Sequence, residues 1–250
     1  MKRPFDDSRK RIAWAKRDFK QFKGRCRRFL KSNPHIAVTE MDDEGIYELH
    51  KIKLAKPLPE VLTHRVSGVL ESLRAALDLA ASSVATLAGG DSGNVHFPFS
   101  ATEADFKSRL GSACKNFPKE IHALFASFKP YKGGDDALWA LNELCNASKH
   151  RLIVPIGMST GPLHVERMEV SGPFRIPYCG WDGDKDELIY AAVRPGTKIR
   201  YKVHVSFAVA FGEIEIMKGK PVEAKLDALI RKVSGIIAAT KAECLKIGLL

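Results

Sequence analysis

The hydrophobic pattern of the chain changes its period near residue 150. Before that point, apolar residues recur every three or four positions, which predicts helices. The later segments are rich in Val, Ile, Phe and Tyr and are bounded by Gly and Pro, which predicts antiparallel strands at 153–158, 163–170, 174–178, 188–193 and 198–211. Helices and strands that are segregated in this way define the α+β class.

The helical half is predicted to hold antiparallel helices and one small β-hairpin. Apolar seams at helical spacing, from Ile12 to Phe29 and from Leu62 to Leu87, mark the two longest helices. Alternating residues on either side of an acidic turn predict the hairpin, with strands at 35–41 and 46–54. Shorter helices are expected at 101–110, 118–128 and 135–150.

A last helix is expected to close the β-rich half, from residue 221 to about residue 245. Its inner side is predicted to consist of Leu226, Leu229, Ile230, Val233, Ile237 and Ala238.

The positive charge is concentrated in the first 31 residues. The chain has a formal charge of +11, with 40 Lys and Arg against 29 Asp and Glu, but residues 1–31 hold 13 of the basic side chains and only 3 acidic ones. The remaining body is therefore close to neutral. Residues 1–31 are predicted to form a basic amphipathic helix with the apolar seam Ile12, Ala15, Phe19, Phe22, Cys26 and Phe29.

Three interpretations of this basic helix stay open at the level of sequence. The seam can pack on the body or against a second copy, and we expect a homodimer. The helix also has the character of a membrane-surface segment. In the third interpretation it binds RNA phosphates, through Lys16, Arg17, Lys20, Lys23 and Arg27, together with Lys149 from a later helix.

Composition excludes several classes of protein. With 45% hydrophobic and 28% charged residues the chain is neither collagen-like nor wholly disordered. Five scattered cysteines without a C-x-x-C pair indicate reduced thiols, and no apolar run is long enough to approach a membrane span. We therefore predict a cytoplasmic protein. The histidines lack metal-ligand spacing, so we expect neither a metal nor a cofactor.

Two helices carry polar residues where an apolar surface is expected. Asn146 and His150 are one turn apart on the 135–150 helix, and Lys149 and Arg151 flank them. Arg74 and Asp78 are likewise one turn apart on the 60–88 helix, on a side that is otherwise apolar. We expect the two helices to pack with Arg74 and Asp78 opposite Asn146, His150 and Arg151.

This set of side chains has a structural and a catalytic interpretation. As a satisfied polar network it would join the two helices in a non-catalytic interaction or ligand-binding protein. As a catalytic site it would offer His150 as a general acid or base and Arg74, Lys149 and Arg151 as cations for a developing negative charge.

The residues around these positions resemble a known sequence pattern. The strings 73–78 (LRAALD), 97–99 (FPF), 129–131 (KPY) and 141–151 (LNELCNASKHR) are similar to an uncharacterised bacterial and phage protein family with LRxALD and LNELxNxxKHR motifs. More distantly, Asn146-x-x-x-His150 resembles the Arg-Asn-x-x-x-His motif of the HEPN superfamily, whose members include metal-independent ribonucleases and RNA-binding partners in toxin and phage-defence systems.

The resemblance implies a divergent HEPN-like RNA-binding protein or metal-independent endoribonuclease. His150 would be the acid or base, Asn146 would position it or the phosphate, and Arg74 with Arg151 would stabilise the developing charge. Cys145 occupies the motif's Arg position and cannot clamp a phosphate, so either Arg74 or Arg151 substitutes for it or the nuclease activity is absent.

The expected organisation has three segments. Residues 1–31 form the basic helix, residues 32–155 the hairpin and the HEPN-like helical region, and residues 156–250 the antiparallel sheet with its closing helix. We expect the last two segments to form one continuous domain.

Overall fold

The computed structural model describes residues 3–91, 93, 95–150, 156–161, 164–176, 180–212 and 216–250, without the side chains of residues 147–150, 156, 165 and 203. It confirms the α+β class. In chain order the elements are α1 (Asp6–Lys31), β1 (His35–Met41), β2 (Glu48–Leu54), α2 (Glu60–Leu87), α3 (Glu103–Ala113), α4 (Lys119–Phe128), α5 (Asp136–His150), β3 (Ile156–Thr160), β4 (His164–Ser171), β5 (Phe174–Arg175), β6 (Trp181–Asp182), β7 (Glu187–Val193), β8 (Lys198–His204), β9 (Phe207–Phe211) and α6 (Val222–Lys246).

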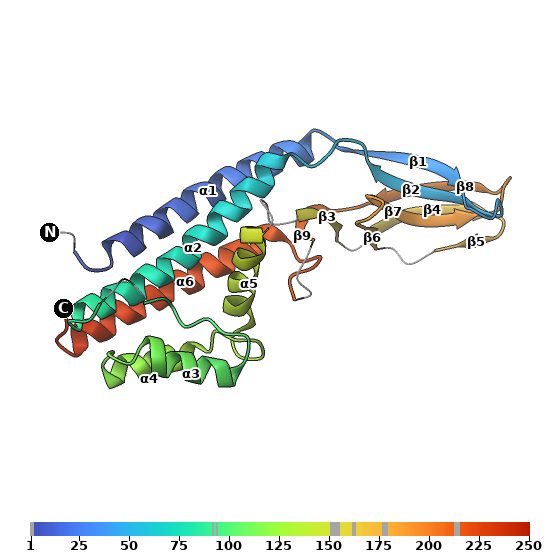
Figure 1. Ribbon diagram of the computed structural model, residues 1–250. Helices are drawn as coiled ribbons and strands as arrows, with labels where there is room; N and C mark the ends of the chain where they lie inside the picture. Colours follow the sequence, from blue (N-terminus) through green and yellow to red (C-terminus); the bar gives the residue numbers. More distant parts are fainter. Residues whose placement is uncertain are drawn as a thin grey trace.

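Three long helices, α1, α2 and α6, form the main body (Figure 1). Helices α1 and α2 are antiparallel, because an early residue of one contacts a late residue of the other. The backbone N–H of Phe5 donates to Ser83 Oγ at 3.3 Å, and Arg65 Nη1 donates to Asp18 Oδ1 at 2.9 Å. The closing helix α6 packs back on both, and the smaller helices α3, α4 and α5 lie on the other side of α2 from α1 (Figure 1).

The apolar seam of α1 packs on the body of the same chain. All six of its predicted residues are buried, with Phe22 fully inaccessible and none of the six more than 8% exposed. Burying three phenylalanines on one helix stabilises the folded chain by several kcal/mol, about 1.5–3 for each ring. This confirms the interpretation in which α1 docks within its own chain.

The inner side of α6 was predicted correctly except at one position. Leu226, Leu229, Ile230, Val233 and Ile237 are buried, whereas Ala238 is exposed. The buried line continues instead through Ile236 and Thr240, since spacings of three and four residues keep side chains on one face of a helix.

The strands of the described residues form three antiparallel sheets beyond one end of the helices (Figure 1). The largest has the order β1-β2-β7-β5, with β6 also paired to β7. The predicted hairpin, β1 and β2, therefore joins the C-terminal strands through the β2–β7 pairing. The other two sheets are the pairs β3–β9 and β4–β8, and the predicted strand 198–211 is divided between β8 and β9 at residues 205 and 206.

Aromatic side chains connect these sheets to each other. Tyr190 of β7 and Tyr201 of β8 hydrogen-bond through their hydroxyls, and burial together with that bond raises the pKa of Tyr190. Near the helices, the ring of His35 on β1 stacks on Phe207 of β9 with ring centres 3.5 Å apart, and Trp181 of β6 meets both edge-on.

Candidate functional site

Arg74 reaches from α2 to α5, as the sequence predicted. Its Nη1 donates a hydrogen bond to Asn146 Oδ1 at 2.6 Å. Its guanidinium carbon also lies 5.7 Å from the centre of the Phe99 ring, within reach of a cation–π interaction. These two contacts hold the guanidinium plane while leaving further N–H donors for other partners, because an arginine carries five.

Asp78 is directed toward the loop that follows α2. Its Oδ1 accepts the backbone N–H of Phe97 at 3.0 Å and lies 3.8 Å from Nδ1 of His96. The prediction that Asp78 faces α5 together with Arg74 is therefore only half right. The loop is held in place because Phe97 and Phe99 are buried, whereas the His96 side chain is 73% exposed.

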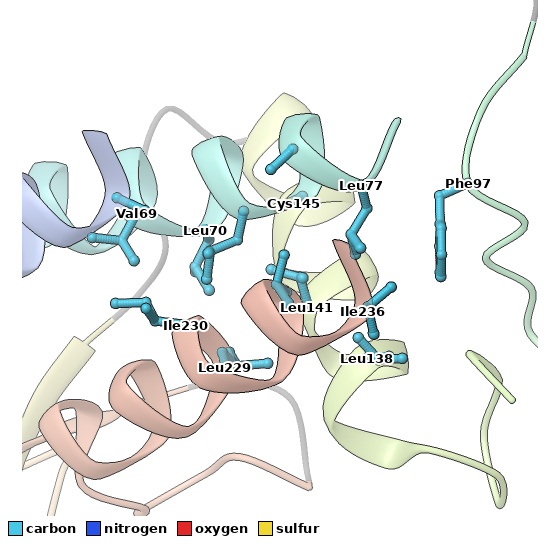
Figure 2. Close-up of a cluster of buried hydrophobic side chains, with 14 of the residues drawn as sticks. Val69, Leu70, Leu77, Phe97, Leu138, Leu141, Cys145, Leu229, Ile230 and Ile236 are labelled. Carbon is cyan, nitrogen blue, oxygen red and sulfur yellow. The ribbon is translucent and has the colours of Figure 1, made fainter. Parts of the chain in front are cut away.

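A pocket of about 400 Å³ lies between α2, this loop, α3 and α5. It is open to solvent, because Glu71, His96 and Arg109 on its rim are exposed. Beneath it, apolar side chains of α2, α5 and α6 form the buried cluster drawn in Figure 2, with Phe97 at its edge. The pocket is lined by Glu71, Arg74, Ala75, Asp78, His96, Phe97, Phe99, Arg109 and Cys145.

The charged groups of the pocket have complementary chemical capacities. Arg74 and Arg109 can stabilise an anion, and an imidazole beside a carboxylate, here His96 beside Asp78, can serve as a general base or acid. Glu71 and Asp78 balance the two arginines, so the pocket suits a ligand that has both an anionic group and hydrogen-bond donors.

The polar line on α5 is described only in part. Asn142 is buried and its Nδ2 donates to Glu143 Oε1 at 3.2 Å, and Asn146 lies one turn further along. His150 is the last residue of α5 and one turn beyond Asn146. The side chains of Lys149 and His150, and the whole of Arg151, lie outside the described residues, so their predicted roles stay predictions.

The cations that were predicted to bind nucleic acid lie along α1. Lys16, Lys20, Lys23 and Arg27 follow one another at spacings of four, three and four, which places them in one line along a flank of the helix. Lys23 covers the Phe19 ring at 4.8 Å, and Arg27 lies 3.9 Å from Glu223 of α6.

Arg17 is exposed as well but does not belong to this line. Its Nε is 3.9 Å from Asp18 Oδ1, and its side chain is 63% exposed.

The basic flank and the Arg74 pocket are separate surfaces. Arg65 and Ser83 both contact α1, and Arg74 is nine residues from each of them. Nine residues span about two and a half helical turns, so Arg74 points away from α1. One short ligand therefore cannot bridge the two surfaces along α2.

His96, Arg109 and Glu71 were not recognised from the sequence. His96 and Arg109 are far from Arg74 along the chain and reach the pocket only through the fold. The one signal for His96 is its position directly before the string 97–99, whose two phenylalanines were noticed and anchor the loop.

The described part of the chain has no metal centre and no membrane-spanning helix. No group of three His, Cys, Asp or Glu side chains there is placed to hold a metal ion. No helix among those residues is long and apolar enough to cross a membrane. Cys26, Cys114, Cys145 and Cys244 are buried outside disulfides, and burial raises the pKa of the Cys114 thiol to about 11.

Comparison of the chain with protein-family models, with curated protein sequences and with solved structures found no match. The geometry of the site is therefore the basis for assigning a function.

Proposed function

We propose that this protein binds RNA and cleaves it without a metal ion, at the pocket between α2 and α5. The observation that carries the proposal is the arrangement of Arg74, held by Asn146 at 2.6 Å, beside the imidazole and carboxylate pair of His96 and Asp78. A cation and a proton acceptor beside a carboxylate, together in one open pocket, can promote attack of an RNA 2′-hydroxyl on the adjacent phosphate.

In the proposed reaction the 2′-hydroxyl of a ribose attacks the adjacent phosphorus. His96 takes the hydroxyl proton as general base, and Asp78 stabilises the imidazolium that forms. Arg74 stabilises the negative charge on the phosphate oxygens. The 5′-oxygen leaves with a proton from a general acid, for which the sequence suggests His150, and the product is a 2′,3′-cyclic phosphate.

In this proposal the basic flank of α1 gives the protein a second contact with RNA. Because it faces away from the Arg74 pocket, its cations would hold a distant part of a long RNA and contribute salt-dependent affinity without changing the chemistry. The predicted homodimer and cytoplasmic location are consistent with this proposal and stay predictions.

A non-catalytic role is the second candidate, and one observation favours it. Arg74 and Asp78 already have partners within the chain, namely Asn146 and the Phe97 backbone. The same contacts would then serve only to join α2, α5 and the intervening loop in an interaction or ligand-binding protein, as a satisfied polar network.

Cleavage of a fluorescent RNA in the presence of EDTA separates the two candidates. We expect wild type to cut an all-ribose strand and to leave a 2′-O-methylated strand intact. His96→Gln should slow cleavage at least about 100-fold, whereas the control His64→Gln changes an exposed histidine of α2 and should retain full activity. Equal cleavage by both variants, or no cleavage by any protein, would overturn the enzymatic proposal.

RNA binding is measured separately by fluorescence anisotropy at several salt concentrations. Replacing Lys16, Lys20 and Lys23 together by Gln should reduce the slope of log affinity against log salt by about 2, at about 0.7 for each phosphate contact. An unchanged slope would show that α1 is a packing helix only.

A further inference from the structure

A second pocket lies between α1 and α6, and of the residues used in the RNA proposal only Lys16 lines it. Its volume is about 380 Å³, within the range of about 300–1,000 Å³ that is typical of small-molecule sites. The floor is apolar and consists of the buried side chains Phe5, Ile12 and Ile237. The exposed residues Ala13 and Ala238 leave its mouth open, because a methyl group is too short to close it.

Three cations surround this apolar floor, and none of the described carboxylates lines it. They are Arg9 and Lys16 of α1 and Lys241 of α6. Among the described residues, no Asp or Glu oxygen lies within 4.0 Å of their charged nitrogens, although Lys10 pairs with Asp7 on the same helix at 3.5 Å. The pocket therefore combines a hydrophobic interior with positive charge that is not neutralised.

Ser234 is part of the pocket lining, and its hydroxyl lies just beneath that lining without a hydrogen-bond partner. Ser234 Oγ is inaccessible to solvent and bonds to nothing in the described chain. Other helical hydroxyls here donate to the carbonyl four residues earlier, as Ser83 does to Leu79 at 2.8 Å and Thr240 to Ile236 at 2.8 Å. A buried hydroxyl left without this bond needs a partner from elsewhere.

We propose that this pocket binds a fatty acid, meaning a single alkyl chain that ends in a carboxylate. The chain would lie on Phe5, Ile12 and Ile237, and the carboxylate would be held by Lys241 and Arg9. Apolar lining together with unneutralised cations selects this chemistry over a neutral or cationic amphiphile. The pocket shares neither Arg74 nor His96 with the proposed cleavage site, so it is independent of the cleavage chemistry, and it shares only Lys16 with the basic flank.

Isothermal titration of the full chain with dodecanoate, below its micellar concentration, tests this site. Dodecanoate should bind with one-to-one stoichiometry, and decanoate should bind up to about 15-fold more weakly, at roughly fourfold for each methylene lost. Dodecyltrimethylammonium carries the same chain with the opposite charge and should bind at least 10-fold more weakly. Equal binding of the two head groups would overturn the proposal, as would no binding of dodecanoate.

Variants assign the binding to this pocket. Ala238→Phe places a ring in the mouth of the pocket and should weaken dodecanoate binding at least 10-fold, whereas Ala228→Phe, at an exposed alanine of the same helix outside the pocket lining, should leave it unchanged. Lys241→Glu should weaken dodecanoate but not dodecyltrimethylammonium. Because both alanines are exposed, neither change disturbs the core, and circular dichroism verifies folding.

Two further outcomes would overturn the assignment. Binding to anionic phospholipid vesicles without binding of free dodecanoate would identify α1 as a membrane-surface helix. A dimer that Ala238→Phe dissociates, again without dodecanoate binding, would identify the pocket as an interface between two copies.

Discussion

Lys51 and Glu187 form a buried ion pair at the β2–β7 pairing, and its removal gives the sharpest test of how the sheet is held together. Lys51 is 9% exposed and Glu187 is 4% exposed, and Lys51 Nζ lies 3.1 Å from Glu187 Oε1 and 3.1 Å from Glu40 Oε2. Burial by itself lowers the pKa of Lys51, but the hydrogen bonds to Glu187 and Glu40 outweigh it, so the pKa stands above its ordinary value.

Lys51→Met should destabilise the fold by about 3 kcal/mol. Removing one partner of a buried pair costs roughly 3–5 kcal/mol, because the other charge stays buried without compensation. The lower end applies here since Lys53 Nζ remains 3.6 Å from Glu187 Oε2 and partly compensates that carboxylate. The double change Lys51→Met with Glu187→Leu removes both charges and should be within about 1 kcal/mol of wild type.

Urea denaturation followed by far-UV circular dichroism measures these differences, provided that the m-value is unchanged. Lys107→Met is the matched control, because Lys107 pairs with Glu103 at 2.7 Å on an exposed helix face and its loss should leave the unfolding midpoint unchanged. If the single variant Lys51→Met unfolds at the wild-type urea concentration, or if the double variant is less stable than the single one, the reasoning from burial is wrong.

Three further changes test other parts of the fold. Phe22→Ala should lower the free energy of unfolding by about 3–5 kcal/mol in urea denaturation, because Phe22 is fully buried. The control Lys20→Ala on the same helix should lower it by less than about 0.5 kcal/mol. Equal effects would show that α1 is not part of the core. Burial lowers the pKa of His35 in the folded chain, so the unfolded chain binds the proton first as the pH falls. The free energy of unfolding should therefore keep its full value above about pH 6.5 and decrease as the pH falls from there toward the lowered pKa of the folded chain. Fluorescence of Trp181, whose ring lies 6.1 Å from His35, reports this loss, and His35→Phe should flatten it. Gly134→Ala should destabilise the turn between α4 and α5 by about 1–3 kcal/mol, because the added Cβ would lie 2.6 Å from the carbonyl oxygen of residue 129. Thermal melts measure this effect, and an unchanged melting temperature would show that the turn relaxes freely.

The helices were predictable from the sequence because their information is local. The seams of α1 and α2 repeat at three and four residues, and nearly every residue of both seams is buried. Pro57 and Pro59 mark the start of α2, and Pro34 follows the end of α1, which is why these ends were placed within a few residues. The one mistaken inner residue, Ala238, shows the weakness of the pattern, since alanine is compatible with either face of a helix.

The sheets were only partly predictable because strand pairing is not local. The sequence indicated most strands but not that β2 pairs with β7, more than 130 residues later, through contacts such as Ile52 with Leu188. Short strands have no periodic signal that identifies their neighbours, and the break at residues 205 and 206 between β8 and β9 was missed for the same reason.

The candidate site was half predictable. Arg74 and Asn146 were expected to meet because polar residues on the apolar faces of two helices need partners, and their hydrogen bond confirms it. His96 was missed because a loop residue has no periodicity. Asp78 was predicted to face α5, whereas its actual partner is the backbone N–H of Phe97. That contact depends on the path of the loop, which the sequence does not specify.

The sequence by itself determined the α+β class, the three long helices and the location of the positive charge, because periodicity, proline positions and charge counts act over short stretches of chain. The tertiary structure alone decided where these parts meet. It buried the seam of α1 in its own chain, placed Arg74 on the opposite side of α2 from the basic flank, and brought His96 to Asp78. These outcomes depend on contacts between distant residues, and such contacts are set by the packing of the whole core.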